Sequence, residues 1–327
     1  MKRIADSGWL IARTAIPLLL IAPVADADPF PARDLNPLLA GFGLPAALPA
    51  RLSGETWTLA ADLNWASVSL VQRAGSEQLI VDAETREARL TIGRSWSSGF
   101  AALVQIPYRY TGGGVLDSTI DSWHELFGLP RGSRAFSPQD RVRIAYASGN
   151  TVLFDERSSQ SGLADISLDF GRSLSSSAAT AATAWLSIKL PSGDADRFTG
   201  SGATDASLAI AAEHRLGENW SAFGQAGVAW LGEGERLAAR QRDFAWSALA
   251  GIGWRATRGL ELKAQLDAHS AVFDEAELDF LGEAFVLTFG GDYRFASGWQ
   301  LDLAVSEDIA VESASDVVFV LGLKKAL

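Results

Sequence analysis

The chain has 327 residues, no cysteine and a formal net charge of −11 at pH 7. The lack of cysteine excludes a disulfide framework and a lipid on an N-terminal cysteine, and the acidity argues against nucleic acid as a partner. A hydrophobic content of 48% is ordinary for a soluble domain and does not separate soluble from membrane proteins.

Residues 1–27 have the pattern of a signal peptide. Lys2 and Arg3 form a basic start, residues 15–24 an apolar stretch, and residues 25–27 an Ala-x-Ala cleavage site. The apolar run is too short to cross a bilayer as a helix. We predict export with cleavage after Ala27, which would change the net charge to −12 because three basic and two acidic residues are removed.

Residues 28–54 contain five prolines and show no alternation of apolar and polar positions. This composition predicts an extended arm without regular secondary structure, and we expect it on the periplasmic side. If the arm entered a barrel from below, that end of the lumen would be obstructed.

From residue 55 onward, apolar residues alternate with small or charged ones, which is the pattern of strands. Residues 260–269 are a clear case, since leucine and alanine alternate there with Glu, Lys, Gln, Asp and His. Alternation alone also fits a soluble sandwich. We count twelve such segments, near residues 55–71, 78–94, 100–110, 162–173, 180–190, 205–215, 219–231, 243–255, 260–270, 284–295, 299–307 and 316–325.

Aromatic residues distinguish a soluble sandwich from a membrane barrel, because they stand at both ends of four of these segments at a constant spacing of ten residues. The pairs are Phe100 with Tyr110, Trp220 with Trp230, Phe244 with Trp254, and Phe285 with Phe295. Ten residues of a tilted strand rise about 25 Å, the height of the apolar band of outer-membrane barrels. An even strand number with short turns between alternate pairs fits the same class, with both termini periplasmic.

We therefore predict an all-β fold: a transmembrane antiparallel β-barrel of about twelve strands over residues 55–327, located in the bacterial outer membrane. Its expected partners are outer-membrane lipid, lipopolysaccharide and the outer-membrane assembly machinery. Residues 111–161 interrupt the strand pattern. Leu116, Ile120, Trp123 and Phe127 have helical spacing, and residues 141–147 and 151–155 form a hairpin pattern. We predict that this helix and hairpin form an inserted extracellular cap or plug that folds over or into the mouth.

Six stretches resemble a bacterial outer-membrane family, domain of unknown function 3187. They are "RDLNPLLAGFGLP" (33–45), "LDSTIDSWHELFGLPRGSR" (116–134), "SGLADISL" (161–168), "LPSGDADRFTGSGATD" (190–205), "QLDAHSAVFDEAELDFLGEA" (265–284) and "SEDIAVESASDVVF" (306–319). The resemblance implies an outer-membrane protein and provides no activity or catalytic residues. The chain ends in "LGLKKAL" rather than on the aromatic residue that is usual for such barrels.

Alternation directs a set of polar side chains into the predicted lumen, and some of these are candidates for ligand binding: Asp267, His269, Asp308, Lys189 and Asp205, with His124 of the helix. The alternative is that the lumen residues pair with one another and fill a narrow barrel. We expect Asp267, His269 and Asp308 to contact the inserted helix or a ligand. If His124 and His269 met in the mouth, closure would respond to acid.

The main functional hypothesis is passage or binding of a small solute through a narrow, plugged lumen, with an acidic bias that favours cations. The second is a non-transporting surface or envelope-integrity barrel with a filled core. The third is a lipid hydrolase at the membrane face. We assign no catalytic residue, since alternation puts His269 and Ser270 on opposite faces of the wall. We assign no metal ligand or cofactor, because the acidic loops lack the spacing of a calcium loop.

Overall fold

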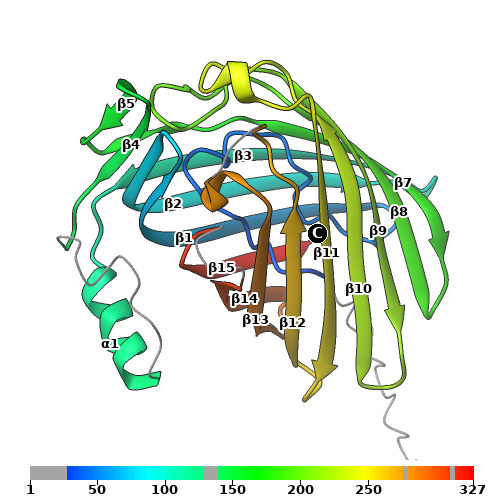
Figure 1. Ribbon diagram of the computed structural model, residues 1–327. Coiled ribbons are helices and arrows are strands. Elements are labelled where there is room, and N and C mark those ends of the chain that lie inside the picture. Colours follow the sequence, from blue (N-terminus) through cyan, green and yellow to red (C-terminus); the bar gives the residue numbers. More distant parts are fainter. Residues whose placement is uncertain (1–27, 128–138, 275–277, 310–313) are drawn as a thin grey trace, which may run out of the picture.

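The computed structural model describes residues 28–127, 139–274, 278–309 and 314–327. Within these ranges, twelve strands form the closed antiparallel barrel that the sequence predicts (Figure 1). Each wall strand pairs with its neighbours in chain order, and the first pairs with the last to close the ring. The wall strands are β1 (Thr56–Ala74), β2 (Glu77–Ser95), β3 (Phe100–Gly112), β7 (Ser167–Ser176), β8 (Thr180–Lys189), β9 (Asp205–Arg215), β10 (Trp220–Trp230), β11 (Phe244–Arg255), β12 (Leu260–His269), β13 (Ala284–Arg294), β14 (Trp299–Asp308) and β15 (Val317–Ala326).

The alternation in the sequence separates the inner and outer faces of the wall. Along β9, Asp205, Ala209 and Glu213 are at most 5% exposed, whereas Leu208 and Ile210 are 60% and 55% exposed. The buried positions face the lumen, and the exposed apolar positions form an outer face suited to lipid.

Aromatic residues end this apolar face in register on neighbouring strands. Trp220 is the register partner of Trp254, with ring centroids 6.2 Å apart, and Trp230 is the partner of Phe244 at the other end. The aromatic pairs predicted at the ends of β10 and β11 therefore lie side by side, and the apolar face between them has the same height on both strands.

The two ends of the barrel differ in their connections. Turns at 96–99, 177–179, 216–219, 256–259 and 295–298 join the strands at one end, where β1 also begins and β15 ends. We call this the short-turn end. Longer connections, including 190–204, 231–243 and 270–283, lie at the opposite end, which we call the long-loop end.

A hairpin extends the wall at the long-loop end. β1 and β2 have 19 residues each and project beyond β3. The projecting part of β2 pairs with β4 (Arg143–Ser148), which pairs with β5 (Thr151–Glu156), and the short β6 (Gln160–Leu163) pairs with β3. The hairpin predicted at 141–155 is therefore present, outside the count of wall strands. Ile144 and Tyr146 on its inner face are buried in an apolar cluster at this end.

The helix of this connection, α1 (Asp117–Phe127), lies on the outside of the barrel (Figure 1). Its N-terminal backbone is held by Glu84, whose Oε1 accepts hydrogen bonds from the amides of Val115 at 2.7 Å and Leu116 at 2.5 Å. Leu116 and Ile120 are buried against the wall. Their partners Trp65, Val305, Val317 and Phe319 point outward, since they alternate with lumen-facing Ala66, Ala304, Val318 and Val320.

The prediction that this helix covers or enters the mouth is therefore wrong, because α1 buries its apolar stripe on the outer face of the wall. In the described part of the chain, no helix is long and apolar enough to cross a membrane.

Residues 28–54 lie inside the ring of strands (dark blue in Figure 1). None of them belongs to a strand or a helix, and residues 37–42 form a turn. The segment rises from the short-turn end, turns at the long-loop end and returns to join β1. This position differs from the periplasmic one that we expected, since the segment occupies the lumen rather than the space below it. We call residues 28–54 the lumenal arm.

Candidate functional site in the barrel lumen

The lumenal arm is bonded to the wall along both of its limbs. No β-ladder connects the arm to the wall, and its backbone instead bonds to polar side chains that point inward. Five prolines lower the number of amide donors that must be satisfied there. The contacts are Phe30 N to Gln265 Oε1 (2.8 Å), Asn64 Nδ2 to Pro31 O (3.0 Å), Leu48 N to Gln225 Oε1 (3.0 Å), Trp185 Nε1 to Pro49 O (3.0 Å) and Thr183 Oγ1 to Ala50 O (2.8 Å).

Ion pairs fix the two ends of the arm near the short-turn end. Lys324 Nζ on β15 lies 2.7 Å from Asp28 Oδ2, where the described arm begins. Arg51 Nε lies 2.6 Å from Glu213 Oε1 on β9, where the arm leaves the lumen. The arm therefore forms a loop through the barrel whose start and finish are both held at the same end.

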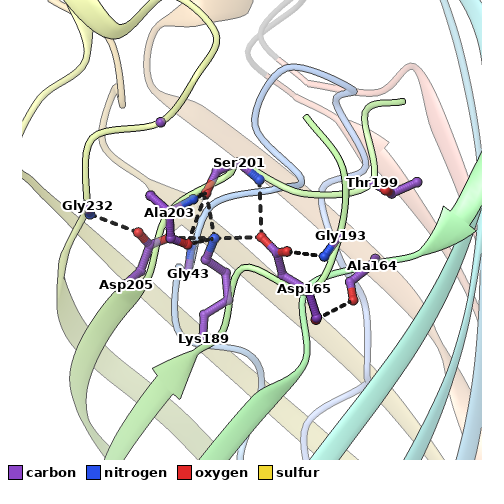
Figure 2. Close-up of polar contacts among 12 residues, drawn as sticks. Gly43, Ala164, Asp165, Lys189, Gly193, Thr199, Ser201, Ala203, Asp205 and Gly232 are labelled. Carbon is purple, nitrogen blue, oxygen red and sulfur yellow. Dashed lines mark hydrogen bonds and ion pairs between the residues drawn. The ribbon is translucent and has the colours of Figure 1, made fainter. Parts of the chain in front are cut away.

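The turn of the arm is anchored by a buried cluster around Lys189 (Figure 2). Lys189 Nζ lies 2.6 Å from Asp165 Oδ2 and 3.2 Å from Asp205 Oδ2, and it also donates to Ser201 Oγ at 2.6 Å. Asp205 Oδ2 accepts a hydrogen bond from the amide of Gly43 at 2.7 Å. A Cβ at Gly43 would come within 2.6 Å of the Asp205 Cβ, so this close approach requires glycine.

The structure therefore brings together two of the predicted candidates, Lys189 and Asp205, and commits both to internal bonds. Asp205 Oδ1 accepts a further hydrogen bond from Gly232 N at 2.9 Å, and Asp165 Oδ1 accepts one from Gly193 N at 2.8 Å. These bonds tie the arm to the connections 190–204 and 231–243. The cluster is an anchor, which agrees with the alternative that lumen residues pair with one another.

His269 and Asp267 face the lumen on β12, as alternation predicts. His269 Nε2 lies 3.3 Å from Asp34 Oδ2 of the arm, and its Nδ1 lies 3.0 Å from Ser270 O. Asp267 accepts hydrogen bonds from Gln265 Nε2 at 3.1 and 2.9 Å. The contact that we expected with the inserted helix is instead a contact with the lumenal arm, because the arm fills the space that we assigned to the helix.

Asp308 and His124 do not join this group. Asp308 Oδ2 accepts a hydrogen bond from Ala314 N at 3.0 Å and so holds the connection between β14 and β15. His124 belongs to α1 on the outer face, and its side chain is outside the described part of the structure. The hypothesis that His124 and His269 meet in the mouth does not hold, because the barrel wall separates α1 from the lumen.

A second charged cluster, on β2 and β3, was missed in the sequence. Glu87 forms ion pairs with Arg89 and Arg109, and all three side chains are at most 6% exposed. Arg109 also donates to Ala40 O of the arm at 2.7 Å and to Phe198 O at 3.0 Å. Alternation within "TREARL" (85–90) places Glu87 and Arg89 on one face, so the signal was present in the sequence.

Three cavities surround the lumenal arm. Their volumes are about 30, 100 and 500 Å³, and Arg33 borders all of them. Asp267 and His269 line the cavity of about 100 Å³. The largest cavity reaches residues of the short-turn end such as Gly298 and Ala326, and seven basic but only three acidic residues line it. The acidic bias expected of the lumen is therefore wrong for this cavity.

The long-loop end is filled by an apolar cluster that includes the turn of the arm. Leu38, Leu39 and Phe42 are at most 7% exposed there, and the Phe42 ring packs edge-on against Phe273 at 5.7 Å between centroids. The other members come from β1, β2, β4, the ends of β10 and β11, and the long connections, among them Leu70, Val81, Tyr146, Phe198, Leu231 and Phe280. Among the described residues, no group of three or more His, Asp or Glu side chains is arranged to hold a metal ion.

Comparison with known proteins identifies a family and a fold. The model of the family described as "Protein of unknown function (DUF3187)" matches residues 20–327. Comparison with curated proteins finds no match. The COG4313 outer membrane channel from Pseudomonas putida F1 is similar, with a TM-score of 0.57 and 15% identity over 85% of this chain and 97% of that chain.

Two more distant structures are similar over most of their length. They are the NanC porin (TM-score 0.47, 8% identity, 83% of this chain and 100% of that chain) and the toluene transporter TodX of Pseudomonas putida (TM-score 0.37, 13% identity, 85% and 91%). At this identity, the likeness to the Pseudomonas putida F1 channel concerns the fold alone: this chain has a barrel fold that is found among outer-membrane channels.

Proposed function

We propose that this chain, which belongs to the DUF3187 family, is an outer-membrane channel for a small solute, and that the lumenal arm is its plug. The aromatic-ended apolar face supports a position in outer-membrane lipid and lipopolysaccharide. The signal peptide pattern of residues 1–27 supports export and assembly by the outer-membrane machinery. The short-turn end, with both ends of the described barrel chain, then faces the periplasm.

The observation that carries this proposal is an arm inside the lumen that is bordered by cavities and contributes no strand to the wall. A strand could not leave without breaking the barrel. The arm, in contrast, is held by side-chain hydrogen bonds and ion pairs, which water can replace, and by apolar contacts of residues such as Phe30 and Leu48 with the wall. Its displacement would open a polar path along Gln265, Asn64 and Gln225 while every wall pairing stays intact.

One observation favours the second hypothesis, a non-transporting barrel with a filled core. The apolar cluster at the long-loop end joins the turn of the arm to β1, β2, β4 and three of the long connections. If this cluster never opens, the lumen is a core, and the long connections are the part available for recognition.

Single-channel conductance in planar bilayers separates these hypotheses. The test variant replaces residues 30–50 by a short glycine-serine linker. The matched control replaces residues 115–127, which include α1, in the same way, because α1 packs on the outer face of the wall. We expect steady conductance from the arm variant, and only rare openings from both the intact protein and the control. If the arm variant is closed although it shows the heat-modifiable gel mobility of a folded barrel, the lumen does not conduct.

A further inference from the structure

We propose that Arg33 on the lumenal arm is the binding residue for the solute, and that this solute is a small organic anion with a carboxylate and an apolar body. This inference names the class of solute for the proposed channel and rests on that function. It starts from a contrast, because the chain as a whole is acidic while the largest cavity of its lumen is lined mainly by basic residues.

Arg33 occupies the junction of the lumen's open space. It borders the cavities of about 30, 100 and 500 Å³ and, among the described residues, is the one that lines all three of them. Its backbone is fixed, since Arg33 N donates to Asn64 Oδ1 at 3.2 Å and the next residue, Asp34, contacts His269. These contacts hold the backbone from which the Arg33 side chain reaches the cavities.

The side chain of Arg33 is not neutralised by the protein. It forms no hydrogen bond or ion pair with another residue in the described part of the chain. Three other basic residues of the cavity differ in this respect: Arg51 pairs with Glu213, Arg89 with Glu87 and Lys324 with Asp28. Of the remaining three, Arg94 and Lys325 lie over the rings of Trp57 and Trp299, and Arg294 donates to Gln300. Glu87, a carboxylate whose charge acts on Arg33, is already shared between Arg89 and Arg109.

Arg33 stays positive although its surroundings oppose the charge, and this favours binding of a negative partner. Burial lowers the pKa of its guanidinium to about 10, and the positive charges of Arg89 and Arg109 act in the same direction, so the group is still protonated at neutral pH. A guanidinium with free donors in a partly desolvated site binds oxyanions, and it pairs with a carboxylate through two parallel hydrogen bonds.

The rest of the cavity favours an organic anion over an inorganic one. Its lining includes Trp185, Leu48, Leu52 and Leu103, which offer apolar surface a short way from the basic groups. Sites for small molecules commonly combine such a lining with a few polar groups that fix orientation. A carboxylate on an aromatic or aliphatic body satisfies both parts, whereas phosphate satisfies only the first.

Equilibrium binding tests the inference without requiring conductance. Isothermal titration calorimetry of the refolded barrel in detergent would use benzoate, acetate and inorganic phosphate as probes. The variants are Arg33→Gln, Arg33→Lys and the matched control Lys325→Gln, which removes one charge from the rim of the same cavity. Because the Arg33 side chain has no partner among the described residues, its replacement should leave the barrel folded.

We expect benzoate to bind more tightly than acetate, and acetate more tightly than phosphate. Arg33→Gln should weaken benzoate at least about tenfold, Arg33→Lys by less, and Lys325→Gln by under about threefold, since a charge-assisted hydrogen bond outweighs a rim charge. Equal binding by Arg33→Gln and the intact protein, or no binding of any probe, would refute the role of Arg33. Tightest binding of phosphate would refute an organic solute. Binding of benzoate without conductance of the arm variant would refute the proposed channel and support the anion site.

Discussion

Replacement of Lys189 by methionine tests whether the lumenal arm is anchored by a buried charge cluster. Lys189, Asp165 and Asp205 have side chains at most 5% exposed, and the ammonium separates the two carboxylates. Removal of one partner of a buried ion pair costs about 3–5 kcal/mol, because the remaining charge stays buried without compensation. Each carboxylate keeps two backbone amide donors, Gly193 and Ser201 on Asp165 and Gly43 and Gly232 on Asp205. We therefore expect the lower end of this range, about 3 kcal/mol.

The free energy of unfolding, measured by urea titration of the barrel in lipid vesicles with tryptophan fluorescence, gives this quantity. Arg143→Met is the control, since Arg143 and Asp155 form a partly exposed ion pair between β4 and β5, and such pairs contribute under about 1 kcal/mol. The double variant Lys189→Met, Asp165→Asn restores the net charge of the cluster and should recover at least about 1 kcal/mol. A loss for Lys189→Met no larger than that of Arg143→Met would refute the reasoning.

Three further perturbations address the helix, the turn of the arm and its first ion pair. Glu84→Gln weakens the hydrogen-bond acceptor at the N-terminus of α1 and should make the helix more mobile, which a spin label on Ser122→Cys would report. The conductance should not change. A changed conductance would indicate that α1 affects the path of the solute. Phe42→Ala removes a buried ring, at a cost of about 3–5 kcal/mol, and should raise the frequency of channel openings by two orders of magnitude or more in bilayer recordings. Burial raises the pKa of Asp28, but the ion pair with Lys324 outweighs this and lowers it below 3.8. The pair therefore stabilises the arm fully above pH 3.8, and this contribution is lost at lower pH. Lys324→Gln lacks the pair, so below about pH 4 the unfolding free energy should fall more steeply in the intact protein than in this variant.

Local pattern was sufficient for the wall of the barrel. Apolar and polar residues alternate with a period of two where the two faces of a sheet have different surroundings, so the sequence of each strand shows which side chains point inward. The twelve strands follow from this pattern, as does the inward direction of Lys189, Asp205, Asp267 and His269. The amphipathic spacing of α1 is equally local. It indicates an apolar stripe that must be buried. A barrel of this kind has two apolar surfaces that could bury it, the apolar cluster at the long-loop end and the outer face of the wall, and the spacing does not distinguish them.

The lumenal arm has no periodicity, so nothing within residues 28–54 reveals its partners. Its contacts are distant in sequence, such as Asp34 with His269 and Gly43 with Asp205, and they depend on the position of the arm in space. The assignment of His269 to the inserted helix failed for this reason. The Glu87 cluster was a different kind of miss, because alternation on β2 and β3 was sufficient to find it.

The contacts of the arm also bear on how the proposed channel would open. The polar bonds along its limbs can be exchanged for bonds to water and so oppose release only weakly. Buried apolar side chains oppose it more strongly. Leu38, Leu39 and Phe42 of the turn, at roughly 1.5–3 kcal/mol each, contribute about 5 kcal/mol or more, and Phe30, Leu35 and Leu48 on the limbs add to this. An energy near 5.5 kcal/mol corresponds to a ratio of about 10⁴, so the released state is rare without a ligand. Binding of a solute at Arg33 can shift this balance only if the solute binds more tightly when the arm has moved. The apolar contacts of the turn and of the limbs are therefore the main barrier that such binding must overcome.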